Sequence, residues 1–214
     1  ARMFVGYGAS CIVLRHQKAG APKYLAENIE IPVINAGDDS REHPTQALLD
    51  VFTIMVKLGK IDGLKIGILG DLRYGRTPSS LSYLLSNWDV KLFFIAPEIL
   101  QIDKRHDAME ERLIELGVDY EKTKKIPPDL DVLYVTRIQK ERFPDIAEYE
   151  RIKGSYSINM EVLGSMKKDC ILLHPLPRTE EISPEVDRDK RAWYFRQAEN
   201  GVYVRAALLS LILG

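Results

Sequence analysis

Short apolar runs alternate along the chain with longer segments in which apolar residues recur every three or four positions. The apolar runs are nearly continuous, as in strands buried on both faces, and the longer segments have the period of amphipathic helices. The predicted strands are residues 11–15, 32–36, 65–70, 91–96, 131–136 and 170–174, and the predicted helices include residues 22–28, 44–58, 78–88 and 105–117. This order predicts an α/β fold in which parallel sheets are covered by helices on both faces.

Two of the helical segments bear on how the chain is organised. The helix predicted from Pro44 places Leu48, Phe52 and Met55 on one stripe and ends near Gly59, so it is long enough to join two lobes. The final run, from about Arg191 to Leu213, also has a helical pattern and follows a proline-containing loop. We expect this last helix to pack back on the N-terminal lobe.

The charge, the cysteines and the lengths of the apolar runs argue against several classes of function. Thirty Lys and Arg residues balance 31 Asp and Glu residues, so the net charge of -1 gives no general attraction for nucleic acid or an anionic membrane surface. The two cysteines, Cys11 and Cys170, lie far apart and form no CxxC pair, which favours a reducing compartment and predicts no metal site. The apolar runs are shorter than the roughly 20 residues of a membrane span. We therefore expect a cytoplasmic protein, and no cofactor is indicated.

Polar candidates gather directly after the predicted strands. Ligands of parallel α/β sheets bind at the carboxyl ends of the strands, so these loops are where a site is expected. The loops contain Arg15 and His16, then Asn35 and His43, then the stretches GDLRYGRT, TRIQKER and HPLPR. Basic and amide side chains recur in them although the whole chain is close to neutral, which predicts a local site for an anion.

His43 has two interpretations. As the residue before a helix that starts with Pro44, it can be a simple capping or surface histidine. Gln46 lies three positions later on the same helix face, however, and a helix N-terminus favours an anion through its free N–H groups. The pair can therefore belong to a binding site.

The arginines of two other loops are also ambiguous. Arg76 can form an ion pair with Asp71 and Arg137 with Glu141, as ordinary surface arginines do. Two arginines at neighbouring strand ends can instead grip the two carboxylates of a small dicarboxylate. Glycines 67, 70 and 75 do not have the GxGxxG spacing of a dinucleotide site, which disfavours a nicotinamide-dependent oxidoreductase.

The HPLPR loop is open to a structural and a functional interpretation. Pro175 and Pro177 can stiffen a turn that His174 caps. In such a turn the carbonyl groups of Pro175 and Leu176 point out of regular pairing, and they can accept hydrogen bonds from an amide.

Six stretches together resemble the catalytic chain of the aspartate carbamoyltransferase family. They are LRH at 14–16, NAGDDSREHPTQALLD at 35–50, GDLRYGRT at 70–77, YVTRIQKER at 134–142, HPLPRTEEI at 174–182 and YFRQAENGVYVR at 194–205. They span nearly the whole chain in the family's order. TRIQKER stands where the related ornithine enzymes have an SMG-type loop, and HPLP stands where they have HCLP, so the resemblance is to the aspartate enzymes.

The resemblance implies a reaction and a role for each site residue. Carbamoyl would pass from carbamoyl phosphate to the amino group of L-aspartate, an early step of pyrimidine biosynthesis, without a cofactor or a metal. Carbamoyl phosphate would be held by Arg15, His43, Gln46, Leu176 and Pro177, with His43 and Arg15 as the catalytic residues. Aspartate would be held by Arg76, Arg137 and Gln139.

The resemblance also implies an organisation into domains. Residues 1–50 would be a remnant of the carbamoyl-phosphate domain, residues 51–190 a Rossmann-like aspartate domain, and residues 191–214 the C-terminal helix on the first domain. Family membership implies a homotrimer and allows a regulatory chain as a further partner.

Some family features are missing from the sequence. No Ser-Thr-Arg-Thr phosphate loop occurs, nor the loop that supplies a serine and a lysine to a neighbouring subunit, and Pro78 and Ser79 replace the family's Val-His. The alternative to an enzyme is therefore an inactive fragment or pseudoenzyme that binds aspartate or serves in assembly.

Overall fold

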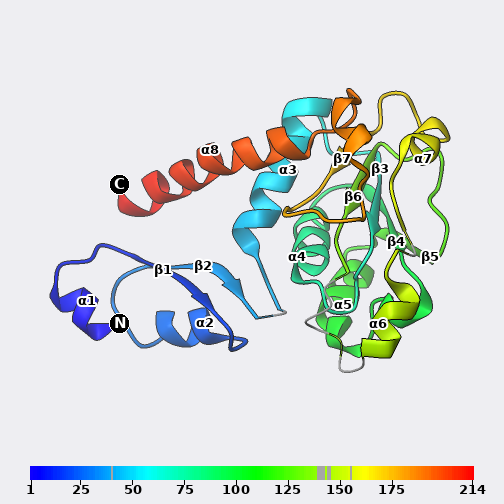
Figure 1. Cartoon of the computed structure of the whole chain (residues 1–214). Coiled ribbons are helices and arrows are strands. Elements are labelled where there is room, and N and C mark those ends of the chain that lie inside the picture. The colour runs from blue at the N-terminus through cyan, green and yellow to red at the C-terminus, as the bar shows by residue number, and fades with distance from the viewer. Residues whose placement is uncertain (40, 139–142, 144–145, 155) are drawn as a thin grey trace.

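The structure is a computed structural model, and it describes residues 1–39, 41–138, 143, 146–154 and 156–214. Helices and strands alternate along most of the chain (Figure 1). The strands are β1 Ile12–His16, β2 Val33–Asp38, β3 Leu64–Leu69, β4 Val90–Ile95, β5 Asp119–Thr123, β6 Val132–Val135 and β7 Ile171–Leu173. The α-helices are α1 Arg2–Gly6, α2 Ala21–Ala26, α3 Pro44–Leu58, α4 Arg76–Leu85, α5 Asp107–Glu115, α6 Ile146–Ile152, α7 Met160–Gly164 and α8 Tyr194–Leu213.

The larger lobe is built on a parallel sheet of five strands in the order β5-β4-β3-β6-β7. The chain starts in the middle at β3, runs outward through β4 and β5, and then returns to place β6 on the other side of β3. The strand order therefore reverses between β3 and β6. In open sheets of this kind the carboxyl ends of the two strands at the reversal leave a crevice in which ligands bind.

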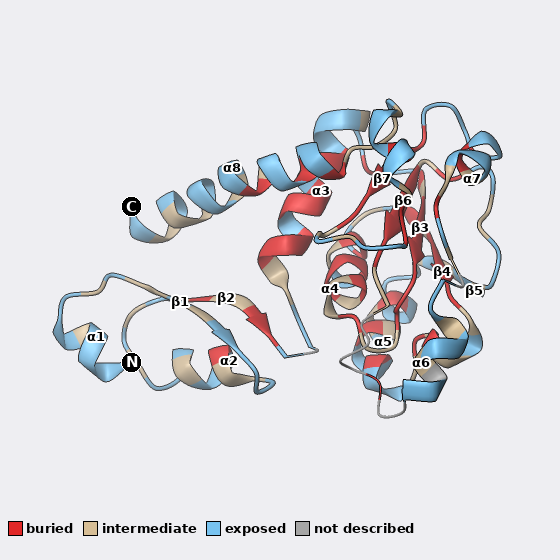
Figure 2. Ribbon diagram, in the orientation of Figure 1, coloured by how far each residue is buried: buried red, intermediate tan, exposed pale blue. Residues whose placement is uncertain are grey.

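Alternate residues of the central strands supply two separate cores. Ile66 and Ile68 of β3 pack with side chains of α3, α4 and α5 on one face, whereas Leu69 packs with α7 and the start of α8 on the other. Most residues of β3, β4 and β6 are fully buried (Figure 2). Since both faces are covered, the strands require the near-continuous apolar runs that the sequence shows.

Helix α3 connects the two lobes, and its ends follow local rules. Pro44 occupies the first helical turn, where its missing N–H needs no partner, and Gly59 ends the helix in the left-handed conformation with φ 73°. Leu49 and Ile54 are buried, whereas Leu48 is partly exposed. The prediction of a helix that ends near Gly59 is confirmed.

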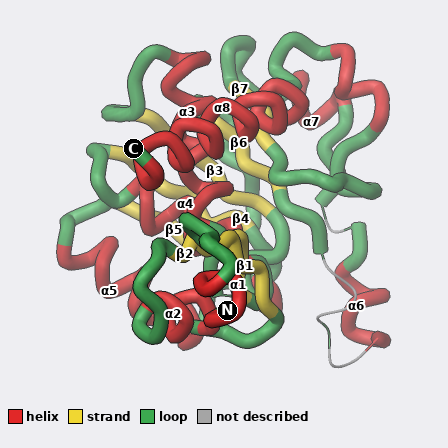
Figure 3. Tube along the Cα trace, turned by 90° about the vertical axis from the view of Figure 1, so that its left-hand side faces the viewer, coloured by secondary structure: helices red, strands yellow, loops and turns green. Residues whose placement is uncertain are grey.

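Helix α8 packs against α3 at its start, and the rest of α8 extends away from α3 (Figure 1); Figure 3 shows the two helices from the side. Two polar links join them: Gln197 Nε2 donates to Asp50 Oδ1 at 2.6 Å, and Asn200 Nδ2 donates to Thr53 Oγ1 at 2.9 Å. Gly201 faces Leu49, and a Cβ at Gly201 would lie 3.2 Å from the Leu49 side chain. This close approach holds the start of α8 against the middle of α3.

The N-terminal lobe is small and thinly packed. Strands β1 and β2 form a two-stranded parallel pair beside α1 and α2. Ile34 is the sole apolar strand residue of this lobe, among those described, that belongs to the buried core, and Val13 is 58% exposed. Figure 2 shows the contrast with the larger lobe. A two-stranded sheet has little cooperative stability of its own.

We expect this difference to appear in native-state hydrogen exchange. The backbone amides of residues 12–14 should exchange by local opening of low free energy, whereas those of residues 66–68 should exchange only through global unfolding. Exchange followed by mass spectrometry with peptide resolution measures both segments in one sample. Equal protection of the two segments would show that the N-terminal lobe unfolds together with the main sheet.

The predicted α/β class with parallel sheets covered by helices is confirmed, but one strand was not predicted from the sequence. Strand β5, with the sequence DYEKT, pairs with β4 at the edge of the sheet. Edge strands lie partly in solvent and carry charged residues, so they lack the apolar run that marks a buried strand. The described residues contain no helix long and apolar enough to cross a membrane.

Candidate active site

A polar cavity of about 230 Å³ lies at the carboxyl ends of β3 and β6, where the strand order reverses. Its walls come from both lobes, from the starts of α3 and α4, and from the loop after β7. The lining residues are Arg15, His43, Gln46, Gly75, Arg76, Thr77, Thr136, Arg137, His174, Pro175, Leu176 and Pro177. Three are arginines and none of the described lining residues is acidic, so the cavity suits an anion.

His43 precedes the first turn of α3 and is held there by its backbone. Its N–H donates to Ser80 Oγ of α4 at 2.8 Å. Burial, together with the positive charges of Arg76, Arg205 and Arg15, lowers the pKa of the imidazole to about 4. The ring is therefore neutral near pH 7, and it can donate one hydrogen bond without carrying a positive charge.

Gln46 lies one turn further along α3 and is buried. Its Nε2 donates to Asp50 Oδ1 at 2.8 Å. Because the amino end of the amide is bound to this carboxyl, the carbonyl end is the part of Gln46 left for the cavity. A carbonyl oxygen there can accept a hydrogen bond from an NH₂ group of a ligand.

Arg76 begins α4 and reaches across to the N-terminal lobe. Its Nη1 donates to the carbonyl oxygen of Asp39 at 3.1 Å, and its guanidinium lies flat on Gly37, where a Cβ would come within 2.8 Å of Arg76 Cζ. Gly37 has φ 113°, a conformation that other residues rarely adopt. The absence of a side chain at position 37 therefore leaves the space that the Arg76 guanidinium occupies.

Arg137 lies two residues after the end of β6 and lines the same cavity. Its neighbour Thr136 is anchored to β3, since the Thr136 N–H and hydroxyl both donate to the Leu69 carbonyl oxygen, at 2.8 and 3.2 Å. Gly70 makes this approach possible, because a Cβ there would lie 2.2 Å from the Thr136 carbonyl oxygen. The ends of β3 and β6 are thus held together, which keeps Arg76 and Arg137 on one cavity.

Both ring nitrogens of His174 form hydrogen bonds within the protein. Its Nε2 lies 2.7 Å from Glu181 Oε1, and its Nδ1 accepts from the Leu176 N–H at 2.8 Å, so the proton is on Nε2. Burial by itself would raise the pKa of Glu181, but hydrogen bonds from His174 and Thr179 outweigh it and lower that pKa to about 2. His174 therefore shapes the loop, as the structural interpretation expects, and the cavity receives the loop's backbone at Pro175, Leu176 and Pro177.

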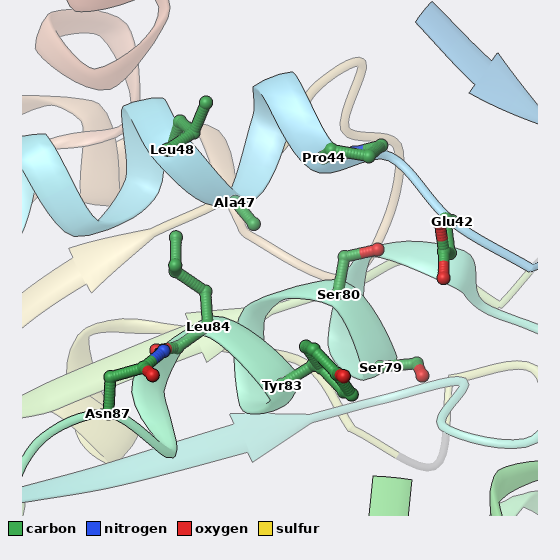
Figure 4. A pocket seen from close by; sticks show the side chains of 9 residues that line it. All are labelled: Glu42, Pro44, Ala47, Leu48, Ser79, Ser80, Tyr83, Leu84 and Asn87. Atoms are coloured by element: carbon green, nitrogen blue, oxygen red, sulfur yellow. The ribbon is translucent and has the colours of Figure 1, made fainter. Parts of the chain in front are cut away.

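A second groove, of about 350 Å³, lies between α3 and α4 and shares no described residue with the polar cavity. Figure 4 shows Ala47 of α3 and Leu84 of α4 pointing toward each other across it, and the lining also includes Leu48 and Tyr83 of the same two helices. Its lining is mainly apolar. Ser80 lines this groove and accepts a hydrogen bond from the N–H of His43, which lines the polar cavity.

The structure brings together seven of the eight site residues expected from the sequence. Arg15, His43, Gln46, Arg76, Arg137, Leu176 and Pro177 all line the polar cavity. Gln139 lies outside the described residues. Thr77 and Thr136 were not expected there, although each adjoins an arginine that was. Gly37 and Asp50 were missed as well, and in the sequence nothing sets them apart from an ordinary loop glycine and a helical aspartate.

Two family matches cover nearly all of the chain. Residues 1–56 match the family described as "Aspartate/ornithine carbamoyltransferase, carbamoyl-P binding domain", and residues 62–212 match "Aspartate/ornithine carbamoyltransferase, Asp/Orn binding domain". The catalytic subunit of aspartate carbamoyltransferase from Thermococcus onnurineus is 54% identical over 95% of this chain. The chain belongs to the aspartate carbamoyltransferase family.

Solved structures of the aspartate carbamoyltransferase family share this fold. The catalytic subunit of M. jannaschii aspartate transcarbamoylase superposes with a TM-score of 0.88 at 46% identity, over 99% of this chain and 69% of that one. The enzyme from Trypanosoma cruzi in complex with carbamoyl phosphate and aspartate has a TM-score of 0.91 at 36% identity, over 100% of this chain and 70% of that one. The chain spans 66% of the length of the Thermococcus relative.

Proposed function

We propose that the polar cavity catalyses carbamoyl transfer from carbamoyl phosphate to the amino group of L-aspartate, which gives N-carbamoyl-L-aspartate and phosphate. The observation that carries the proposal is the gathering of three arginines, a neutral histidine and an oriented glutamine on one cavity at the switch point of the sheet. Both substrates are anions with several oxygen acceptors, and the cavity offers mainly donors.

Carbamoyl phosphate fits the side of the cavity formed by α3 and the loop after β7. Arg15 would bind the phosphate, and the His43 imidazole would donate to the carbonyl oxygen. The Gln46 carbonyl, with the backbone of Leu176 and Pro177, would take the carbamoyl NH₂ group. These donors and acceptors distinguish the two ends of the molecule, because only one end carries an amide.

L-Aspartate fits the side formed by Arg76 and Arg137. Each guanidinium can bind one carboxylate through two parallel hydrogen bonds, which fixes the direction of the amino group. Gln139, the other aspartate residue that the resemblance implies, lies outside the described residues. The Asp71 alternative for Arg76 does not account for the position of its guanidinium on Gly37.

The chemical step needs orientation and charge stabilisation. The neutral amine of aspartate attacks the carbonyl carbon, so a C–N bond forms, the C–O bond to phosphate breaks, and the nitrogen passes one proton to the departing phosphate. Negative charge grows on the carbonyl oxygen before phosphate leaves. A neutral His43 and the positive Arg15 stabilise that charge, and no covalent bond to the protein is required.

The test is the formation of labelled N-carbamoyl-aspartate from labelled carbamoyl phosphate by the whole chain, with ornithine as the competing acceptor. We expect product with aspartate and none with ornithine. No product above the uncatalysed background would reject the catalytic proposal in favour of a fragment that only binds. Product with ornithine would reject the assigned acceptor.

We further propose that the chain acts in the cytoplasm as a homotrimer and that a regulatory chain is a possible partner. Family membership and the relatives' description as catalytic subunits support these assignments. We also propose the division into residues 1–50, 51–190 and 191–214, in which the last segment packs back on the first; the contacts of α8 with Leu49 and Asp50 support it. Light scattering of the purified chain measures the oligomer, and a monomer at micromolar concentration would contradict the trimer.

Replacing Gly37 by alanine should weaken the binding of a dicarboxylate. The new methyl group would displace the Arg76 guanidinium, and the positive φ would cost about 1 kcal/mol or more of stability. Calorimetric titration with succinate, which is aspartate without the reacting amine, should show an affinity several-fold lower.

Gly59→Ala is the matched control for this variant. Gly59 has φ 73° at the end of α3, and the space around it is open, so alanine there carries a similar backbone cost without touching Arg76. We expect a similar loss of thermal stability and an unchanged affinity for succinate. If both variants bind succinate alike, the contact between Gly37 and Arg76 has no part in the site.

A further inference from the structure

Asp50 is a buried carboxyl that the proposed mechanism does not use. It lies on α3 one turn after Gln46, and its side chain is fully buried. Oδ1 accepts two hydrogen bonds, from Gln46 Nε2 at 2.8 Å and from Gln197 Nε2 at 2.6 Å. Burying an acidic group is costly unless something is gained from its contacts, so its place next to a cavity residue calls for an explanation.

The first contact determines which way Gln46 presents its amide. Asp50 Oδ1 accepts hydrogen bonds, and an ionised carboxylate has no proton to donate. Gln46 therefore turns its amino end inward to the carboxyl and its carbonyl end toward the cavity. An apolar residue at position 50 would leave both orientations of the amide open.

The second contact leads to the opposite wall. Gln197 of α8 uses its amino end for Asp50, and its Oε1 accepts the backbone N–H of His174 at 2.8 Å. The His174 N–H is the first of the loop whose residues Leu176 and Pro177 line the cavity. The chain of hydrogen bonds thus runs from Gln46 through Asp50 and Gln197 to the loop after β7.

A third neighbour is Tyr134 of β6. Its ring is fully buried, and its hydroxyl lies close enough to Asp50 and to Thr77 that both influence its pKa. Thr77 lines the cavity beside Arg76. Asp50 therefore adjoins side chains that reach three walls of the cavity, from α3, α4 and the loop after β7.

We propose that Asp50 is a positioning residue, which fixes the Gln46 amide and the 174–177 loop relative to each other so that they bind one carbamoyl group together. This proposal rests on the proposed function for its ligand, but the network itself can be tested without any ligand. Asp50 acts through Gln46 and Gln197 and does not touch the substrate.

The carboxyl is also poised to respond to pH. Burial raises the pKa of Asp50 to about 7, although the hydrogen bonds from Gln197 and Gln46, the nearby Tyr134 hydroxyl and the positive charge of Arg205 on α8 oppose the shift. Tyr134, the titratable neighbour from β6, has its own pKa raised well above 10 by burial and by Asp50. The carboxyl therefore changes charge near neutral pH while its neighbours keep theirs.

The first experiment follows the side-chain amides by ¹⁵N NMR in the ligand-free chain. The NH₂ groups of Gln46 and Gln197 should titrate together, with one midpoint near pH 7, because both donate to the same oxygen. In Asp50→Asn both should lose this transition. Two different midpoints, or no transition between pH 5 and 9, would overturn the shared network.

The second experiment measures the binding of phosphonoacetamide, an unreactive isostere of carbamoyl phosphate in which carbon replaces the bridging oxygen. Asparagine at position 50 can turn its own amide, so it no longer enforces the orientation of Gln46. We expect Asp50→Asn to bind about tenfold more weakly at pH 8 and to lose the pH dependence near 7. Equal affinity with an unchanged pH profile would contradict the positioning role.

Asn200→Ala is the matched control. It removes the other polar link between α3 and α8, the bond to Thr53 Oγ1, which does not lead to the cavity. We expect a loss of stability with phosphonoacetamide affinity unchanged. If the wild-type chain binds no phosphonoacetamide and yet its amides titrate together, the proposed function fails and the network stands.

Thermal stability supplies a readout with the opposite sign. A group whose pKa is raised by folding binds its proton more tightly in the folded state, so the contribution of Asp50 to the stability of the wild-type chain is lost as pH rises from about 4 through 7. Asp50→Asn does not carry this cost. Its Tm relative to wild type should rise with pH over that range, while its affinity for phosphonoacetamide at pH 8 falls. If Asp50 had only a structural role, Asp50→Asn would change Tm and the affinity for phosphonoacetamide in the same direction.

Discussion

Replacing His43 by alanine is expected to lower kcat for carbamoyl transfer by a factor of roughly 10² to 10³, the usual cost of removing one donor to a developing oxyanion. The neutral imidazole at the start of α3 would no longer meet the carbonyl oxygen of carbamoyl phosphate. Since the donor matters most when charge develops, kcat should fall far more than the affinity for phosphonoacetamide. Steady-state kinetics and calorimetry on the same preparation separate the two effects.

The pH behaviour of His43 gives an independent check. Because its pKa lies at about 4, the imidazole stays neutral from pH 6 upward, and its ionisation should leave no step in the rate profile above that pH. Folding lowers this pKa from 6.5, so the unfolded chain binds the proton first, and the contribution of His43 to stability should fall as pH drops from about 6.5 toward 4. His43→Ala should remove that part of the acid sensitivity.

His106 supplies the matched control for His43. It is buried, at 7% exposure, whereas His43 is half-buried, and it lies before α5 and takes part in a capping box with Asp103. His106→Asn should change thermal stability and leave kcat within about twofold of wild type. Comparable losses of kcat in the two variants would mean that His43 acts through folding.

Replacing Arg137 by alanine is expected to weaken the binding of succinate by roughly 100-fold, or about 3 kcal/mol, since two hydrogen bonds to a charged group are lost. The affinity for phosphonoacetamide should change by less than about threefold, because the donors for that ligand come from the other side of the cavity. Calorimetric titration with each ligand separately gives the ratio of the affinity loss for succinate to the affinity loss for phosphonoacetamide. Equal losses for both would contradict the assignment of Arg137 to the dicarboxylate.

Arg196→Ala controls for the general loss of a positive charge. Arg196 is on α8, its side chain is 71% exposed, and its guanidinium pairs with Glu199 on the same helix. Removing it changes the net charge as Arg137→Ala does, without touching the cavity. Both affinities should remain those of the wild-type chain.

The architecture explains why both lobes are needed for this cavity. Arg15 comes from β1, and Gly37 supports Arg76 from the end of β2, so the thinly packed N-terminal lobe supplies part of the anion site. The larger lobe supplies Arg137 and the loop after β7. Ligand binding should therefore protect the amides of β1 and β2 from exchange, since a ligand that bridges the lobes stabilises the weaker one.

Much of the fold is determined by local sequence. The apolar runs of β3, β4 and β6 identify a sheet buried on both faces, and Pro44 and Gly59 mark the ends of α3. Strand β5 escaped because an edge strand needs no continuous apolar face. Seven residues that line the polar cavity could be named in advance, because carboxyl ends of parallel strands converge and because the motifs resemble those of a known family.

What the tertiary structure alone decided is how these residues are held. Gly37 supports Arg76 from 39 positions away, Gln197 reaches Asp50 across 147 positions, and Thr136 bonds to the end of β3. The sequence determines which side chains exist and on which local element each lies, because helix and strand periods act over a few residues. Partners distant in the chain meet only through packing, so the orientation of Gln46, the neutral state of His43 and the raised pKa of Asp50 depend on the folded molecule.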